Sequence, residues 1–137
     1  MGADLMPLID WPLRNGRPCI QVVLALAEGG QPLERNLLAD TGAGSLLSGF
    51  ELILDEDDCL LCGGNPLEPI TLGGAYTGTY PIYLLAVQIP TLGFSRNVRV
   101  VGVTSVPNGF DGIACFNFLN RFQYGNFGNS SLFGLQS

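Results

Sequence analysis

The sequence of 137 residues contains no histidine and no lysine. The lack of histidine excludes catalysis by Ser-His-Asp or Cys-His groups, and it also excludes metal sites that depend on imidazole ligands. The cationic side chains are six scattered arginines in a chain of net charge −6. Binding to phosphates needs clustered cations, so we expect no nucleic-acid partner. The chemistry that is left rests on carboxylates, hydroxyls, thiols and a few guanidinium groups.

Long apolar segments are also missing from the sequence. No charge-free apolar run approaches the roughly 18 residues that a membrane-spanning helix needs. Residues 1–6 lack the basic region with which a secretory signal begins. We therefore expect no membrane partner and predict a cytoplasmic location.

The four cysteines are few, and their spacing does not complete a metal site. Cys59 and Cys62 have the separation found in half a zinc site or in a redox motif. A structural zinc site needs a second such pair, and a redox pair needs an activated thiol beside a strand and a helix. We interpret them as ordinary reduced thiols and expect no metal and no cofactor. A redox or metal function for Cys59 and Cys62 stays as an alternative.

Charged residues make up only 13% of the chain and hydrophobic residues 47%, which is typical of a folded domain. The length predicts one domain over residues 1–137. The 19 glycines and 9 prolines favour short strands and turns, so we expect an all-β fold. Strand-like segments occupy residues 19–27, 33–39, 67–72, 79–89 and 98–103. Residues 115–122 predict a short helix, whereas residues 51–62 fit either a surface loop or a helix.

One carboxylate directly follows the apolar run that ends the second of these strands. Residues 37–45 read LLADTGAGS, so Asp40 lies where a strand meets a turn and is followed by Thr41 and Gly42. Gly42 and Gly44 can adopt backbone angles closed to other residues, which lets a ligand approach the backbone closely. An aspartate at a strand end is also a common turn former. The tripeptide alone therefore does not separate a catalytic from a structural role.

Two segments further along the chain bear on whether Asp40 is catalytic or structural. Residues 73–78 read GGAYTG and form the tip of a hairpin between two strand-like segments. Such a tip is either a plain β-turn or a lid that closes on a ligand. Residues 110–113 read FDGI and directly precede the predicted short helix.

Together, these three landmarks resemble the active-site motif, the flap and the glycine-containing segment beneath the active site of retropepsin-like aspartic proteases. They occur in that family's order and at its rough spacing, from about residue 19 to the C-terminus. The resemblance implies a closed, Greek-key-like β-barrel of the single-lobe acid protease type, with one short C-terminal helix. It also implies a two-fold homodimer and makes Asp111 a turn residue.

The resemblance assigns the site residues as follows. Asp40 is the catalytic acid, and Thr41 and Gly42 support the active site. The residues expected to contact substrate are Ala43, Gly74 and Tyr76. Peptide hydrolysis needs two carboxylates that share a proton around one water molecule. Because the chain offers one such aspartate, the second must come from another copy, and two-fold dimers are the commonest oligomers.

The expected function is therefore an aspartic endopeptidase that acts as a homodimer on peptide or protein substrates. The sequence departs from the family's pattern at two positions. Many members have an acidic residue where Gly44 stands and an arginine where Phe116 stands, and these two side chains pair. Both charges are absent here, so neither would be left buried without its partner. The alternative is a protease-fold module that binds peptides or mediates assembly without cleaving them.

Overall fold

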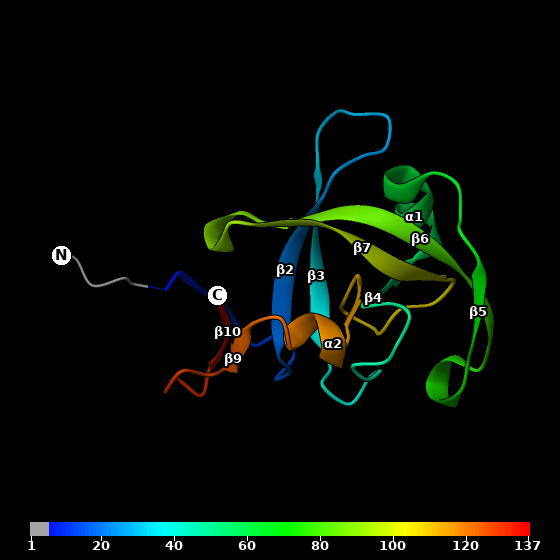
Figure 1. Cartoon of the computed structure of the whole chain (residues 1–137). Coiled ribbons are helices and arrows are strands. Elements are labelled where there is room, and N and C mark those ends of the chain that lie inside the picture. Colours follow the sequence, from blue (N-terminus) through cyan, green and yellow to red (C-terminus); the bar gives the residue numbers. More distant parts are fainter. Residues whose placement is uncertain (1–5) are drawn as a thin grey trace.

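A computed structural model describes residues 6–137 (Figure 1). Residues 1–5, on which part of the expectation about a secretory signal rests, lie outside the described residues. The elements follow in the order β1 (Leu8–Pro12), β2 (Cys19–Leu24), β3 (Leu33–Ala39), β4 (Leu52–Asp55), α1 (Glu56–Gly63), β5 (Pro69–Leu72), η1 (Gly74–Tyr76), β6 (Gly78–Ile89), η2 (Pro90–Leu92), β7 (Phe94–Val103), β8 (Gly112–Ala114), α2 (Phe116–Leu119), β9 (Gln123–Gly125) and β10 (Leu132–Gln136). The fold is mostly β, as the composition predicts. None of the helices in this part of the chain is long and apolar enough to cross a membrane.

Six strands close into a barrel, which confirms the closed architecture that was expected. They pair in the order β2-β3-β8-β4-β7-β6, and β6 returns to β2 through Val23↔Gln88 and Leu24↔Val87. β5 pairs with the other end of β6 and forms a hairpin that projects from the barrel (Figure 1). The barrel strands bring apolar side chains inward, and Ile20, Leu37 and Leu54 are fully buried. Burial of each such side chain contributes about 1.5–3 kcal/mol.

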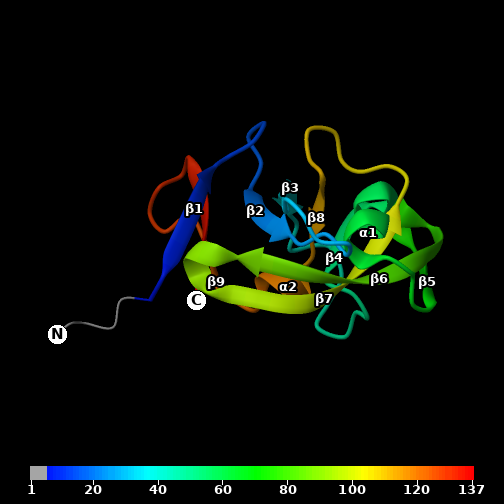
Figure 2. The ribbon, with the colours of Figure 1, turned by 90° about the horizontal axis from the view of Figure 1, so that it is seen from above.

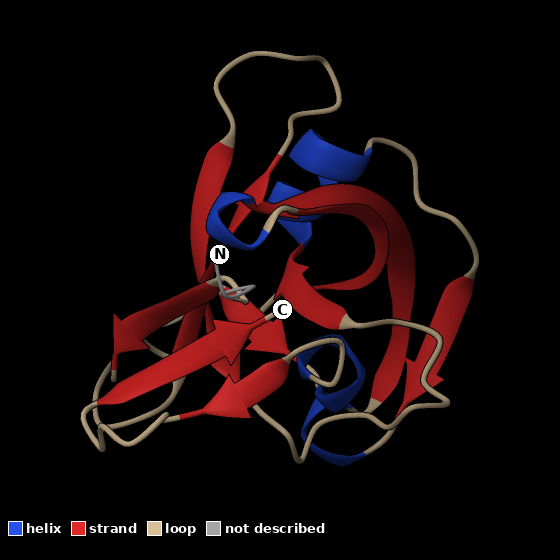
Figure 3. Ribbon diagram, turned by 60° about the vertical axis from the view of Figure 1, so that its left-hand side comes forward, coloured by secondary structure: helices blue, strands red, loops and turns tan. Residues whose placement is uncertain are grey.

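The two ends of the chain meet in a second, three-stranded sheet of order β1-β10-β9. β1 pairs antiparallel with β10 from Leu8↔Gln136 to Pro12↔Leu132. Figures 2 and 3 show this terminal sheet beside the barrel, at the end of the molecule opposite the β5 hairpin. The loop of residues 40–51, here called the Asp40 loop, follows β3 and lies between the terminal sheet and that hairpin in Figure 1.

The short strand β8 fixes the end of β3. It lies between β3 and β4, parallel to the first (Ala39↔Ala114) and antiparallel to the second (Leu54↔Gly112). This insertion is tight, because a Cβ atom at Gly112 would lie 2.2 Å from the carbonyl oxygen of Ile53. The segment of residues 110–113 therefore packs directly against the strand that delivers Asp40.

Several segments differ in detail from the sequence-based expectation. Residues 51–62, which fitted a loop or a helix, contain the strand β4 and most of the helix α1, a second helix besides the expected C-terminal one. The helix expected over residues 115–122 has one turn, Phe116–Leu119. The strand expected over residues 19–27 ends at Leu24, and β7 begins at Phe94, four residues earlier than predicted.

Candidate active site

Asp40 lies immediately after β3, and its backbone is held by the neighbouring strand. Its N–H donates to the carbonyl oxygen of Ala114 at 3.0 Å, and its own carbonyl accepts from the N–H of Ala43 at 3.1 Å. The side chain is half-buried. Its Oδ1 accepts a hydrogen bond from the N–H of Gly42 at 2.9 Å, whereas no described residue donates to Oδ2. Asp40 therefore closes its own turn through Oδ1, whereas Oδ2 has no donor among the described residues.

The two glycines of this loop are required for different reasons. A Cβ atom at Gly42 would lie 3.3 Å from Oδ1 of Asp40, so glycine lets the backbone close around the carboxylate. Gly44 has a φ of +70°, and a Cβ atom there would lie 3.1 Å from Oγ of Ser48. An acidic side chain at Gly44 would be strained in this conformation. This geometry gives a physical reason for one of the two departures from the family's pattern.

Other contacts attach the loop to α2 in place of the missing acid–arginine pair. The N–H of Phe116 donates to the carbonyl oxygen of Ala43 at 2.8 Å. At the end of the loop, Arg121 donates from Nε to Oε1 of Glu51 at 2.5 Å and from Nη2 to Oε2 of Glu51 at 2.8 Å. Bidentate arginine–carboxylate pairs add geometric specificity to a contact. The site is thus held within the chain without an ionic pair at positions 44 and 116.

The tip of the β5–β6 hairpin and the Asp40 loop line a common pocket. The tip is the short helix η1, in which Gly74 has a φ of +69° and accepts a hydrogen bond from Oγ1 of Thr77 at 2.7 Å. Tyr76 is half-buried, and it packs with Ala43 against a buried apolar cluster around Ile113. Its ring meets that of Tyr80 edge-on, with centroids 6.4 Å apart. Through Tyr76, the tip thus packs against the same apolar cluster as Ala43.

Two pockets meet at Asp40, and residues of the hairpin tip line both of them. One of about 430 Å³ is lined by Asp40, Gly42, Ala43, Gly74 and Tyr76 together with apolar side chains such as Phe50 and Leu72. The other, of about 460 Å³, extends from Asp40 and Tyr76 towards Arg17, Tyr80 and Val103. The structure thus brings five of the six sequence-predicted site residues together.

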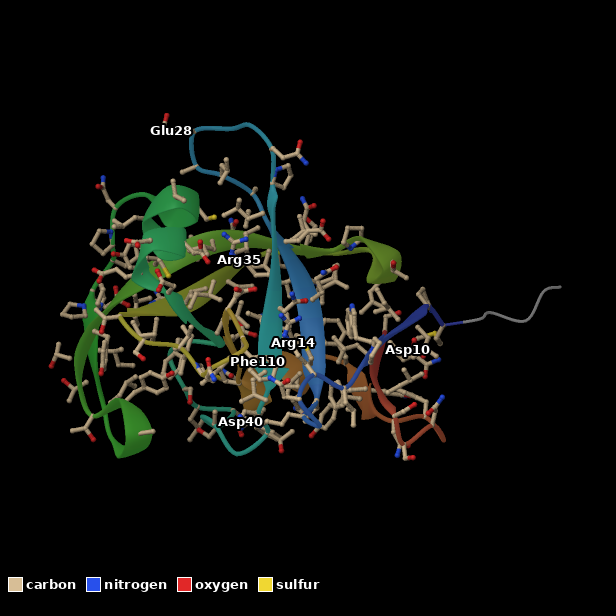
Figure 4. The ribbon with its side chains drawn as sticks, turned by 180° about the vertical axis from the view of Figure 1, so that it is seen from behind. Asp10, Arg14, Glu28, Arg35, Asp40 and Phe110 are labelled. Atoms are coloured by element: carbon tan, nitrogen blue, oxygen red, sulfur yellow. The ribbon has the colours of Figure 1, made fainter. Side chains whose placement is uncertain are left out.

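The sixth predicted residue, Thr41, lines neither pocket and is exposed beside Asp40. Sequence reasoning missed Arg17, Phe50 and Tyr80, which come from separate parts of the chain. Nothing in their local sequence indicates a site, because only the closure of the barrel brings them to Asp40. Figure 4 shows Asp40 at the end of β3, with Phe110 and Arg14 near it.

A further pocket, of about 510 Å³, lies on the other side of Phe50, and Asp40 does not line it. It is larger than the two pockets at Asp40. Its charged groups are already engaged, since Arg121 pairs with Glu51 and Arg99 pairs with Glu68. We therefore place the candidate chemistry at Asp40.

Asp40 is the one carboxylate that lines the two pockets among the residues that the structure describes. Asp111 lies elsewhere, where its Oδ2 accepts from the N–H of Asn36 at 2.8 Å and its N–H donates to the carbonyl oxygen of Asn36 at 2.8 Å. It thereby connects the segment before β8 to β3. A second acid for catalysis is thus missing from the pockets of a single chain.

The cysteine pair does not have the properties of a redox or metal site. Cys59 and Cys62 are buried thiols on α1, and burial raises the pKa of Cys59 to about 12 and also raises the pKa of Cys62. Reactive thiols have a lowered pKa. No group of three or more potential metal ligands occurs within residues 6–137.

Comparison of the chain with protein-family models, with curated proteins and with solved structures found no match. What the site can do therefore follows from its own geometry. A carboxylate with one available oxygen, two flanking pockets and an overlying hairpin tip can hold an extended chain and place a water molecule against it.

Proposed function

We propose that the chain is one half of an aspartic endopeptidase of the retropepsin-like type, which acts as a homodimer. The observation that carries the proposal is the position of Asp40 at the junction of two pockets beneath the hairpin tip. Its Oδ2 receives no hydrogen bond from the described residues, so it can accept a proton from a bound water molecule. The sequence resemblance and the closed barrel support the same function.

The second carboxylate comes from Asp40 of another copy. Thr41 and Gly42 are exposed next to it, so none of the described residues covers this part of the loop. A two-fold axis beside the loop brings two Asp40 side chains together, and carboxylates this close share one proton. The ionised carboxylate accepts a proton from water, and the protonated one donates to the oxygen of the scissile carbonyl. The hydroxyl of Thr41 supports this arrangement from beside the axis.

The substrate is an extended peptide that lies between the loop and the hairpin tip. Side chains on either side of the cleaved bond enter the two pockets. In the pocket of about 430 Å³, Phe50 and Leu72 favour an apolar group. Backbone hydrogen bonds to an extended hairpin give affinity that is independent of sequence. Closure of the tip, with Gly74 and Tyr76, excludes bulk water from the reacting carbonyl.

Replacement of the carboxylate tests this proposal directly. Asp40→Asn keeps the shape of the side chain and its hydrogen bond to Gly42, but an amide cannot accept the proton of the water. We expect no detectable cleavage of a mixed peptide library between about pH 4 and 7, with thermal unfolding and dimerisation as in the wild type. Asp57→Asn, at an exposed position of α1, is the matched control and is expected to retain activity. Cleavage by Asp40→Asn at the wild-type rate would rule out the mechanism.

The alternative is a module that binds peptides or mediates assembly without cleaving them. It is favoured by the single carboxylate in the pockets of each chain, which is inactive unless a second copy approaches correctly. An inhibitor that mimics the tetrahedral intermediate of aspartic proteases separates the two functions. Inhibitor-sensitive cleavage supports the endopeptidase, whereas inhibitor binding by a protein that cleaves no peptide supports the binding module.

A further inference from the structure

Arg17 is held in a fixed place by a tight turn before β2. The turn is closed by two backbone hydrogen bonds, from the N–H of Arg14 to the carbonyl oxygen of Arg17 at 2.9 Å and from the N–H of Arg17 to the carbonyl oxygen of Arg14 at 3.0 Å. Its central residues, Asn15 and Gly16, have φ angles of 54° and 72°. Positive φ at both central residues is the signature of a rigid two-residue hairpin turn.

The guanidinium group of Arg17 is stacked but not paired. Its central carbon lies 5.8 Å from the centroid of the buried Phe110 ring, within the range of a cation–π contact. Within residues 6–137 it has no ion pair, whereas Arg35, Arg99 and Arg121 each have one. The neighbouring Arg14 is engaged with the carbonyl oxygen of Gly109 at 2.6 Å. Arg17 is therefore a positioned cation whose hydrogen-bond donors remain available.

Arg17 lines the same pocket of about 460 Å³ as Asp40. These two are the charged side chains of that pocket, and its other lining residues are apolar or neutral, such as Tyr80, Val103 and Pro107. A negatively charged side chain that enters the pocket would meet Arg17 as well as Asp40, in partly apolar surroundings. In the proposed dimer Asp40 shares one proton with its counterpart, which reduces its repulsion of a second anion. Arg17 is itself exposed, and the bidentate geometry of an arginine–carboxylate contact makes it selective for an acidic group.

We propose that Arg17 determines specificity by binding an acidic side chain of the substrate peptide close to the cleaved bond. This inference rests on the proposed function, in which Asp40 marks the position of that bond. The two-fold dimer carries one Arg17 in each half of the site, so an acidic residue is accepted on either side of the cleavage point. Arg17 binds the substrate and its transition state alike, so its effect lies in KM and not in kcat.

Paired peptides test the inference. Each pair is identical except for Glu or Gln at one of the positions two to four residues from the cleaved bond, on either side. The wild-type protein is expected to prefer the Glu member at one of these positions by about tenfold in kcat/KM, through KM. Arg17→Gln removes the preference, and Arg17→Glu transfers it to the corresponding Lys peptide. Arg96→Gln, which changes an exposed arginine outside both pockets, leaves the preference unchanged.

Binding of the same pairs to Asp40→Asn, followed by fluorescence anisotropy, separates this inference from the proposed function. Glu-selective binding that Arg17→Gln abolishes, in a protein whose wild type cleaves no peptide, supports the role of Arg17 and overturns the protease. Cleavage without any preference for Glu overturns the role of Arg17 and leaves the protease intact. A preference for Glu that persists in Arg17→Gln and Arg17→Glu also overturns the role of Arg17. If the protein neither cleaves nor binds the peptides, both proposals are overturned.

Discussion

The four cysteine side chains are buried thiols, and burial raises the pKa of each, to about 12 for Cys59 and Cys115. A thiol in the unfolded chain has its ordinary pKa of 9.0, so above that pH the unfolded chain binds fewer protons than the folded chain. The stability that the buried thiols contribute is therefore fully present below about pH 9, and this contribution is lost as the pH rises towards 12. Cys59 and Cys115 each add a slope of about 1.4 kcal/mol per pH unit in this window. Urea unfolding under reducing conditions, between about pH 8 and 10, measures the loss.

Alanine variants at Cys59 and Cys115 serve as controls, because each is expected to reduce this slope. The pKa values of Tyr76 and Tyr83 are also raised by burial, but from an ordinary value of 10.0. The decrease in the free energy of unfolding that begins near pH 9 is therefore caused by the thiols. A free energy of unfolding that stays constant from pH 8 to 10 would contradict the prediction. Rapid alkylation of the folded protein near pH 8 would instead support the redox alternative.

The residues of the site differ in how far the sequence reveals them. Asp40 could be found because an apolar strand, a carboxylate and two glycines are adjacent in the chain, and their local conformation follows from their order. Gly74 and Tyr76 could be found because a glycine-flanked tip between strands predicts a hairpin. Arg17 could not be found, since its position depends on stacking with Phe110, which lies far along the chain. Local patterns do not encode such contacts.

At the scale of elements, β8 leaves no room for a side chain at Gly112. A Cβ atom at Gly112 would lie 2.2 Å from the carbonyl oxygen of Ile53 and 2.6 Å from Cδ2 of Leu54. Gly112→Ala must separate β8 from β4, and we expect it to reduce the free energy of unfolding by about 3 kcal/mol or more. Gly73→Ala is the matched control, because a Cβ atom there has no neighbour within 4 Å. Denaturant unfolding measures both, and equal effects would contradict this account of β8.

The elements that sequence patterns predicted well are those with a continuous apolar signal. β3 has the predicted bounds, Leu33–Ala39, because its apolar end is followed directly by a turn. The beginning of β7 was missed because residues 95–97 are polar and exposed, and they belong to the strand only through pairing with β6. Residues 51–62 stayed ambiguous because β4 runs without a turn into α1, where Asp55 caps the helix by accepting from the N–H of Asp57 at 2.9 Å.

At the scale of the whole molecule, the position of the Asp40 loop limits how two copies could meet in the proposed dimer. The loop lies between the terminal sheet and the β5–β6 hairpin (Figure 1), so a second copy that reaches Asp40 also approaches these two elements. Leu46 and Leu47 of the loop are 63% and 95% exposed, although both are apolar. Exposed apolar side chains beside the candidate site are typical of a surface that contacts another molecule. The sequence predicts the need for a second carboxylate but not the surface that supplies it.

If the active unit contains one Asp40 from each chain, a dimer of one wild-type and one Asp40→Asn chain must be inactive. Wild-type protein mixed and re-equilibrated with an equal amount of Asp40→Asn leaves about a quarter of the dimers with two aspartates, by random pairing. We therefore expect the mixture to cleave peptide at about half the rate given by the wild-type chains alone, and progressively less as the variant is added in excess. Light scattering checks that the mixture stays dimeric, and an equal amount of Asp57→Asn in place of the inactive variant controls for added protein. A rate that depends only on the amount of wild-type chain, whatever the excess of Asp40→Asn, would show that one chain carries a complete site and would contradict the shared pair of carboxylates.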